Sequence, residues 1–136
     1  MTANEFVDDI CRLNPDLVLF DPYVIGLPNG TVKSSNEDPL LRAAASILLN
    51  DLQGAHEITQ ADEDDPVHAY LHGIIHRREG DFWNANYWFR RAKSLSAELK
   101  LEPEGLTARV QGSQSVSAEL KEELLNELKT IITYII

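Results

Sequence analysis

Histidines are the side chains of this sequence whose type and spacing best suit metal chemistry. His68, His72 and His76 lie four residues apart, which places them on one face of a helix. Within that face His72, His76 and Glu79 would present two imidazoles and one carboxylate to a divalent metal. His56, on a preceding antiparallel helix, would supply a further ligand. The sequence therefore predicts a metal site made of His56, His72, His76 and Glu79.

The same histidines have a second interpretation, because clustered titratable groups often serve packing alone. The sequence contains no H-E-x-x-H pattern and no set of cysteine ligands, which leaves both interpretations open. No other cofactor is indicated. No serine or cysteine stands at a spacing that suggests a nucleophile with its base, so catalytic residues stay unknown and enzyme activity stays undecided.

Arginines in the same region could hold a carboxylate or phosphate in bidentate fashion. Alternatively they pair with nearby acidic groups such as the tract 62–65, an arrangement that contributes about 0–1 kcal/mol at a surface. Among the neighbouring aromatic residues, helical spacing favours a buried stripe that leaves Trp83 or Tyr87 partly exposed for contacts. The basic side chains concerned are Arg77, Arg78, Arg90, Arg91 and Lys93.

Composition limits the class of protein. The chain has 136 residues, of which 43% are hydrophobic and 25% charged, values typical of one globular domain spanning 1–136. Its net charge of −10 argues against nonspecific nucleic-acid binding, which requires a basic face. Cys11 has no cysteine to pair with, and the first residues lack the basic region of a signal peptide, so we expect a cytoplasmic protein. No apolar run is long enough to span a membrane.

Apolar periodicity predicts an all-α bundle of about six helices. Asp38-Pro39 and Asp65-Pro66 each combine an N-cap residue with proline at the first helical position. Turn formers predict loops over 21–37 and 102–114, whereas the short apolar run 17–20 could be strand or helix. The expected helices cover 3–13, 38–49, 52–60, 66–79, 82–99 and 117–134.

Residues 39–60 repeat at 69–90, an offset of 30 that aligns 50–52 with 80–82. The second unit resembles the tetratricopeptide (TPR) repeat through a small residue, a turn and a small–aromatic–small series. These residues are Gly73, Gly80-Asp81-Phe82, Ala85, Phe89 and Ala92. The resemblance implies a double helical hairpin over about 38–99, with His72 and His76 replacing the usual leucine and tyrosine.

The TPR resemblance also implies a concave groove lined by Tyr70, Arg77 and Arg78. Together with Trp83 and Tyr87, these residues are the predicted contacts for a protein or a small anionic ligand. The pattern H-x3-H-R-R-E-G-D-x2-N-A-x-Y-W-F-R-R, from His72 to Arg91, is similar to a set of uncharacterised bacterial and fungal proteins. That similarity implies no activity.

The last helix ends in the apolar run 131–136, which must pack on the bundle or on another copy. We therefore expect a homo-oligomer, most simply a dimer. The preferred function is a protein-interaction or small-ligand-binding module with an arginine-lined groove. The alternative is a metal-dependent enzyme or sensor that uses the histidine and glutamate cluster.

Overall fold

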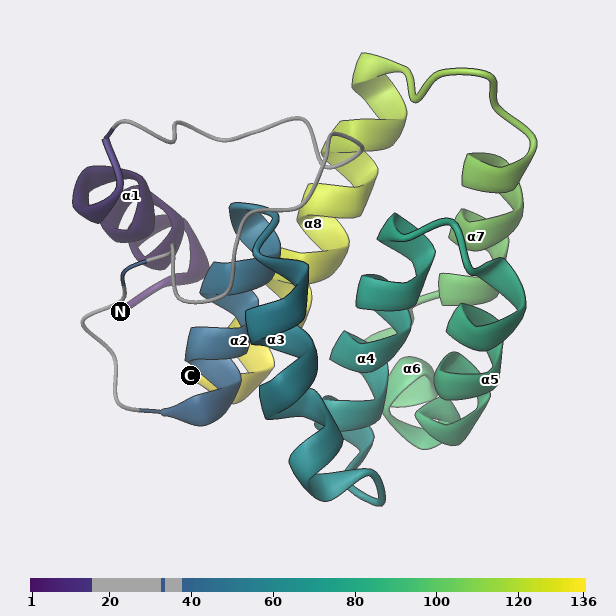
Figure 1. The fold of residues 1–136 in the computed structure, drawn as a ribbon, viewed down its shortest axis with the longest axis horizontal. Helices are drawn as coiled ribbons and strands as arrows, with labels where there is room; N and C mark the ends of the chain where they lie inside the picture. The colour runs from purple at the N-terminus through teal and green to yellow at the C-terminus, as the bar shows by residue number, and fades with distance from the viewer. Residues whose placement is uncertain (16–32, 34–37) are drawn as a thin grey trace.

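The protein is an all-α helical bundle in the computed structural model, which describes residues 1–15, 33 and 38–136 (Figure 1). Within these residues there are eight α-helices, one 3-10 turn at Gln60–Asp62 and no strand, so the fold class is confirmed and the expected count of six helices is wrong. Apart from residue 33, the predicted loop over 21–37 and the run 17–20 lie outside the described residues. The helices are α1 (Ala3–Leu13), α2 (Pro39–Leu48), α3 (Leu52–Thr59), α4 (Pro66–Arg78), α5 (Phe82–Arg91), α6 (Lys93–Leu99), α7 (Pro103–Gln111) and α8 (Ala118–Ile135).

The predicted helix starts are confirmed by their caps. Asp38 accepts hydrogen bonds from the amides of Leu40 and Leu41, and Asp65 accepts one from the amide of His68. In both cases proline follows the cap at the first helical position, where its missing N–H costs nothing. Thr2, Asp51, Asp81 and Ser117 cap α1, α3, α5 and α8 in the same way.

The repeat seen in the sequence corresponds to two turns of the same type, one after α2 and one after α4. Asn50 between α2 and α3 has φ of 64°, and Gly80 between α4 and α5 has φ of 81°. In each turn the next residue, Asp51 or Asp81, donates its amide to a carbonyl five residues earlier, at 2.7 and 2.9 Å respectively. This is the Schellman pattern, which ends a helix through one residue of left-handed conformation.

Two predicted boundaries are wrong. The helix expected over 82–99 is divided at Ala92, after which α6 turns and packs against α4 with Leu95 buried. The segment expected to be a loop over 102–114 contains α7. Pro103 occupies its first turn, a position where proline favours a helix, and Gly112 follows its last residue.

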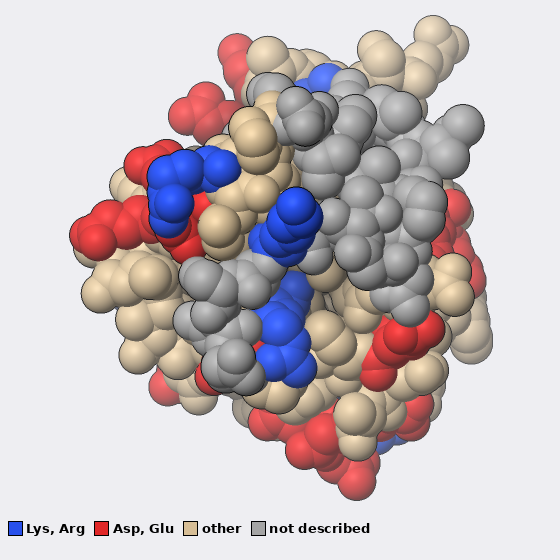
Figure 2. Space-filling model, turned by 60° about the vertical axis from the view of Figure 1, so that its left-hand side comes forward, with Lys and Arg blue, Asp and Glu red and all other residues tan. Residues whose placement is uncertain are grey.

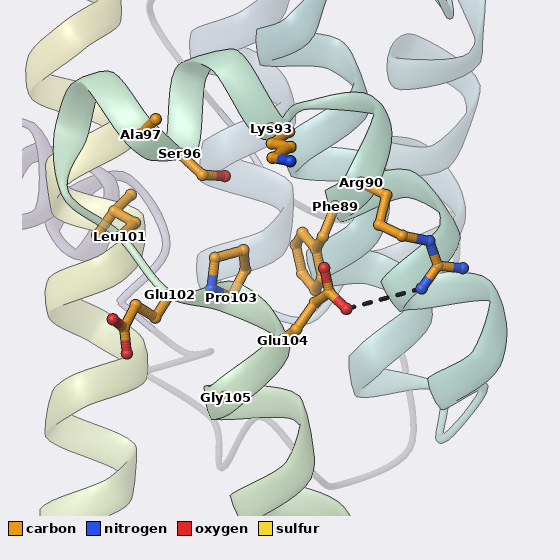
Figure 3. A pocket seen from close by; sticks show the side chains of 10 residues that line it. All are labelled: Phe89, Arg90, Lys93, Ser96, Ala97, Leu101, Glu102, Pro103, Glu104 and Gly105. Carbon is orange, nitrogen blue, oxygen red and sulfur yellow. Dashed lines mark ion pairs between the residues drawn. The ribbon is translucent and has the colours of Figure 1, made fainter.

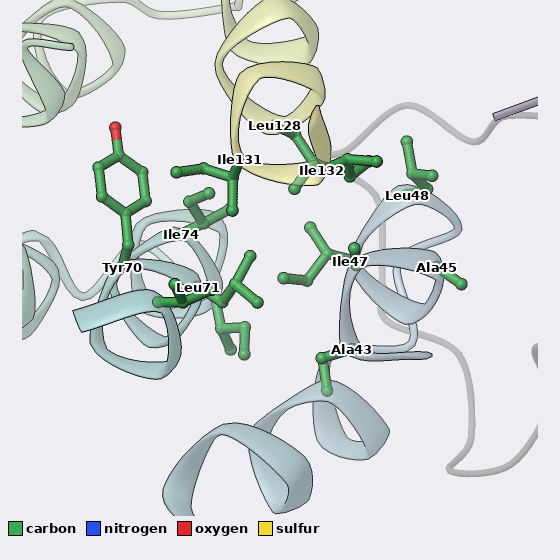
Figure 4. Packing of buried hydrophobic residues seen from close by; sticks show 14 of the residues in the cluster. Ala43, Ala45, Ile47, Leu48, Tyr70, Leu71, Ile74, Leu128, Ile131 and Ile132 are labelled. Carbon is green, nitrogen blue, oxygen red and sulfur yellow. The ribbon is translucent and has the colours of Figure 1, made fainter. Parts of the chain in front are cut away.

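The core lies where α2, α4 and α8 meet. Figure 4 shows Ile131 of α8 on the side of Ile74 of α4, and Ile132 extending toward Leu48 of α2. Next to Ile74 in α4, a Cβ on Gly73 would lie 2.5 Å from the ring of Phe89, so only glycine permits this approach of α4 to α5. The central helix α4 thus packs against α5 and α3, and its buried side chains also meet those of α2 and α8.

Charged side chains of both signs share the face shown in Figure 2, with a few basic groups in the middle and acidic groups toward the margins. Among the described residues, no helix combines the length and apolar character needed to cross a bilayer.

Candidate metal centre

Three of the predicted metal ligands converge. His56 projects from α3, while His72 and His76 project from one face of α4. One ligand nitrogen from each ring lies within 4.8 Å of the other two. The ring centroids are 4.7 Å apart for His56 and His72, 4.7 Å for His72 and His76, and 5.5 Å for His56 and His76.

Local folding explains this convergence. The spacing of four residues places His72 and His76 one turn apart on α4. α3 packs against α4, to which it is connected through Gln60–Asp62, and this packing brings the ring of His56 edge-on to the other two rings. The prediction that these three histidines lie together is therefore confirmed, although metal binding itself stays a prediction.

His72 is the most deeply placed of the three, with 3% of its surface exposed. Its ring stacks on Trp88 of α5 at 4.2 Å between centroids and 12° between planes. Burial, together with the neighbouring His76 and His56, lowers the pKa of His72 to about 3. The imidazole is consequently neutral at physiological pH, the form that binds metals.

One nitrogen of His72 has no partner. Its Nδ1 is buried and, within the described part of the chain, forms no hydrogen bond. A buried polar atom in this condition carries a desolvation cost of about 1–3 kcal/mol unless a ligand or water satisfies it.

His76 is oriented by a carboxylate. Its Nδ1 lies 3.2 Å from Oε2 of Glu79, and its Nε2 lies 3.4 Å from Nδ2 of Asn84 on α5. With Nδ1 protonated toward Glu79, Nε2 carries the lone pair. Glu79 was predicted as a fourth ligand. The structure instead places it behind His76, in the position from which carboxylates commonly orient metal-binding histidines.

His68 does not belong to this cluster. Its Nδ1 lies 2.6 Å from Oδ2 of Asp65, the cap residue of α4. It therefore offers a natural control among the histidines of the same helix.

Arg77 and Tyr70, predicted to line a groove, are in the interior. Arg77 is 2% exposed and donates to both carboxylate oxygens of Glu127 on α8, at 2.7 and 2.9 Å. Tyr70 donates its hydroxyl to the same carboxylate at 2.7 Å, and Thr107 on α7 accepts from Arg77 at 3.3 Å. These side chains join α4, α7 and α8, and in this arrangement Arg77 and Tyr70 are not accessible to an external ligand.

The other three predicted contact residues lie nearer the surface. Arg78 is partly buried and donates to the backbone oxygen of Ile47. Trp83 and Tyr87 are exposed, at 75% and 38%, and their rings stack at 6.2 Å. The guanidinium of Arg91 lies 5.8 Å from the ring of Tyr87, so α5 presents an aromatic and basic surface to solvent.

Trp88 and Asn84 are parts of the histidine site that the sequence analysis missed. They stand four residues apart on α5, which places them on the face that packs against His72 and His76. The sequence signal was that His72 and His76, and likewise Asn84 and Trp88, are four residues apart on the two helices of one hairpin. It became useful only once the hairpin brought these faces together.

This arrangement offers three imidazoles, of which His76 is backed by a carboxylate, and such a donor set suits Zn²⁺ and related cations. Comparison of the chain with protein-family models, curated proteins and solved structures found no match.

Proposed function

We propose that this protein binds a divalent transition metal of the Zn²⁺ class through His56, His72 and His76. The observation that carries the proposal is the grouping of three imidazole nitrogens, from two helices, within 4.8 Å. The unsatisfied Nδ1 of His72 and the carboxylate behind His76 support it.

The distances between the imidazole nitrogens of the three histidines are close to those that a bound metal requires. Zinc–nitrogen bonds of about 2.0–2.1 Å in a tetrahedron place the nitrogens about 3.3 Å apart. Since the present separations are at most 4.8 Å, the rings would need to approach by about 1.5 Å or less. Rotation of His56, which is only partly buried, is the least costly way to do this.

Three histidines leave one position of a tetrahedral metal open. Structural zinc sites usually have four protein ligands, whereas catalytic sites have three and a water molecule. The donor set therefore favours an accessible metal, in a metal-dependent enzyme or sensor, over a purely structural one. The weak bond between Asn84 and Nε2 of His76, 3.4 Å long, would be given up to the metal.

A protein-interaction role is the second candidate. The stacked and exposed pair Trp83 and Tyr87, with Arg91 beside it, favours this role because interfaces are enriched in these residue types. The arginine-lined groove has less support, because Arg77 is engaged by Glu127 in the interior.

The test uses Trp88 as a reporter. Trp83 and Trp88 are the two tryptophans of the chain, so a Trp83→Phe background leaves Trp88 as the sole tryptophan, stacked on His72. Protein purified without a histidine tag and stripped of metal is titrated with Zn²⁺ by calorimetry and with Ni²⁺ by fluorescence. We expect one metal per chain and quenching of Trp88 by Ni²⁺.

The matched variants are His56→Gln and His68→Gln. Loss of one of three ligands should weaken binding by at least about tenfold in His56→Gln, while His68→Gln should retain the parent affinity. Equal affinities in the two variants, or no binding at millimolar Zn²⁺, would overturn the proposal.

A further inference from the structure

A second candidate site, separate from the histidines, is a cavity of about 580 Å³ between α5, α6 and the start of α7 (Figure 3). Its volume lies within the range of small-molecule sites. Ten residues line it: Phe89, Arg90, Lys93, Ser96, Ala97, Leu101, Glu102, Pro103, Glu104 and Gly105.

The base of the cavity is apolar. Phe89 and Pro103 are buried, and Leu101 is half-buried between α6 and α7. Such a surface would hold an aliphatic or aromatic group of a ligand away from water. Ser96 adds a buried hydroxyl, which donates to the backbone oxygen of Ala92 at 3.2 Å and keeps its lone pairs as acceptors.

Charged side chains of both signs line the cavity. Arg90 and Lys93 come from α5 and α6, whereas Glu102 and Glu104 come from the start of α7. Arg90 and Glu104 face each other across one side, with 3.7 Å between their charged atoms and about half of each side chain exposed. An ion pair so long and so open is weak, and a ligand group of either sign can compete for its partner.

We propose that this cavity binds a small zwitterion of the amino-acid class that has an apolar side chain. Arg90 and Lys93 would take the carboxylate, Arg90 through its two-pronged guanidinium. Glu104 and the lone pairs of Ser96 would take the ammonium group. The apolar side chain would lie on the surface made by Phe89, Leu101 and Pro103. The equal numbers of basic and acidic side chains that line the cavity favour this class over a simple anion or a simple cation.

Three related probes test the charge requirement. L-phenylalanine has both charged groups, 3-phenylpropionate lacks the ammonium group, and phenethylamine lacks the carboxylate. Binding is measured by ligand-observed NMR and by the shift in melting temperature. We expect phenylalanine to bind at least about tenfold more tightly than either analogue, since each analogue leaves either the basic or the acidic side chains of the cavity without a partner.

Two variants locate the binding. Ala97→Phe places a ring in the cavity from an exposed position of α6 and should abolish binding. Arg90→Gln should weaken binding of phenylalanine by about tenfold, given that a charged hydrogen bond to the carboxylate is lost. The control is Arg109→Gln, because Arg109 and Glu123 form a similarly exposed pair outside the cavity.

The proposal is overturned if the three probes bind equally, if none binds at millimolar concentration, or if Arg90→Gln and Arg109→Gln behave alike. Repeating the titrations in His56→Gln keeps the result independent of the metal site.

Discussion

At the scale of single residues, the two turns that end α2 and α4 depend on positive φ angles. Gly80 has φ of 81°, and a Cβ there would meet no atom within 4 Å. A side chain at Gly80 would therefore clash with no neighbour, and any cost of substitution comes from the backbone conformation. Asn50 has φ of 64° in the corresponding turn, which asparagine tolerates better than other side chains do.

We expect Gly80→Val to lower the free energy of unfolding by at least about 1 kcal/mol, since β-branched residues strongly resist positive φ. Gly105→Val is the control and should change stability little, because Gly105 of α7 has no positive φ and a Cβ there would meet only the Cβ of Glu102, at 3.9 Å. Urea denaturation measures both. An unchanged midpoint for Gly80→Val would mean that the turn between α4 and α5 does not need its left-handed residue.

At the scale of helices, the start of α4 couples a cap to a histidine. Asp65 accepts from the amide of His68 at 3.0 Å and lies 2.6 Å from its ring. Partial burial alone would raise the pKa of Asp65, but the hydrogen bonds and charge of His68 outweigh this effect and lower it. Because the folded-state pKa is lowered, the stabilisation is present above the unfolded value and is lost as pH falls through the folded value.

Asp65→Asn keeps the cap but removes the charge. At pH 5 we expect wild type to be more stable than this variant by up to about 1 kcal/mol, since Asp65 is one-third exposed. The difference should shrink as pH falls and vanish once the Asp65 carboxyl is protonated in both the folded and the unfolded state. The same substitution in a His68→Gln background should show a smaller difference. Thermal unfolding across pH tests this, and a difference that grows toward low pH would contradict it.

Helices α4 and α8 are joined by the buried pair of Arg77 and Glu127. Glu127→Gln would leave the guanidinium buried without its countercharge, which should cost about 3–5 kcal/mol. Glu123→Gln, one turn earlier on α8, breaks a half-exposed pair with Arg109 and should cost about 0–1 kcal/mol. Denaturant unfolding compares the two variants. Similar losses in both would show that the interior pair does not hold α8 in place.

The sequence predicted those helices whose signals are local. Three helices were predicted from such signals: α2 and α4 from their caps at Asp38 and Asp65, and α8 from its apolar periodicity. Each signal acts within a few residues. The division at Ala92 was missed because no proline or glycine lies between 82 and 99. The helix α7 was missed because Pro103 was taken as a loop former, although proline also starts helices.

In the candidate site, too, local sequence patterns predicted only those features that do not depend on tertiary contacts. Spacing along α4 predicted the convergence of His72 and His76. Burial of Arg77 could not be predicted, because its partner Glu127 stands 50 residues away and three arginines nearby have the same charge. Local spacing therefore identified the face of α4 that carries the histidines. Tertiary packing decided which of the neighbouring side chains remain accessible to a ligand.

At the scale of the whole molecule, the apolar C-terminal run folds back on its own chain. Ile131 and Ile132 are fully buried against α2 and α4, while Tyr134 and Ile136 remain about half exposed. The predicted dimer would have to form around these exposed residues, and it stays a prediction.

Deletion of 131–136 should strongly destabilise the protein, since loss of each buried isoleucine costs about 2–5 kcal/mol. Deletion of Ile136 alone should change little. Thermal unfolding with light scattering checks this. A truncated protein of unchanged stability but halved particle mass would mean that the run serves a second copy.

Above all, we propose that three histidines from α3 and α4 hold a metal. X-ray absorption at the zinc edge, on protein loaded with one equivalent of Zn²⁺, tests it most directly. We expect about three imidazole nitrogens at about 2.0–2.1 Å and one further light atom. A shell containing sulfur at about 2.3 Å, or one made of oxygen alone, would contradict the claim.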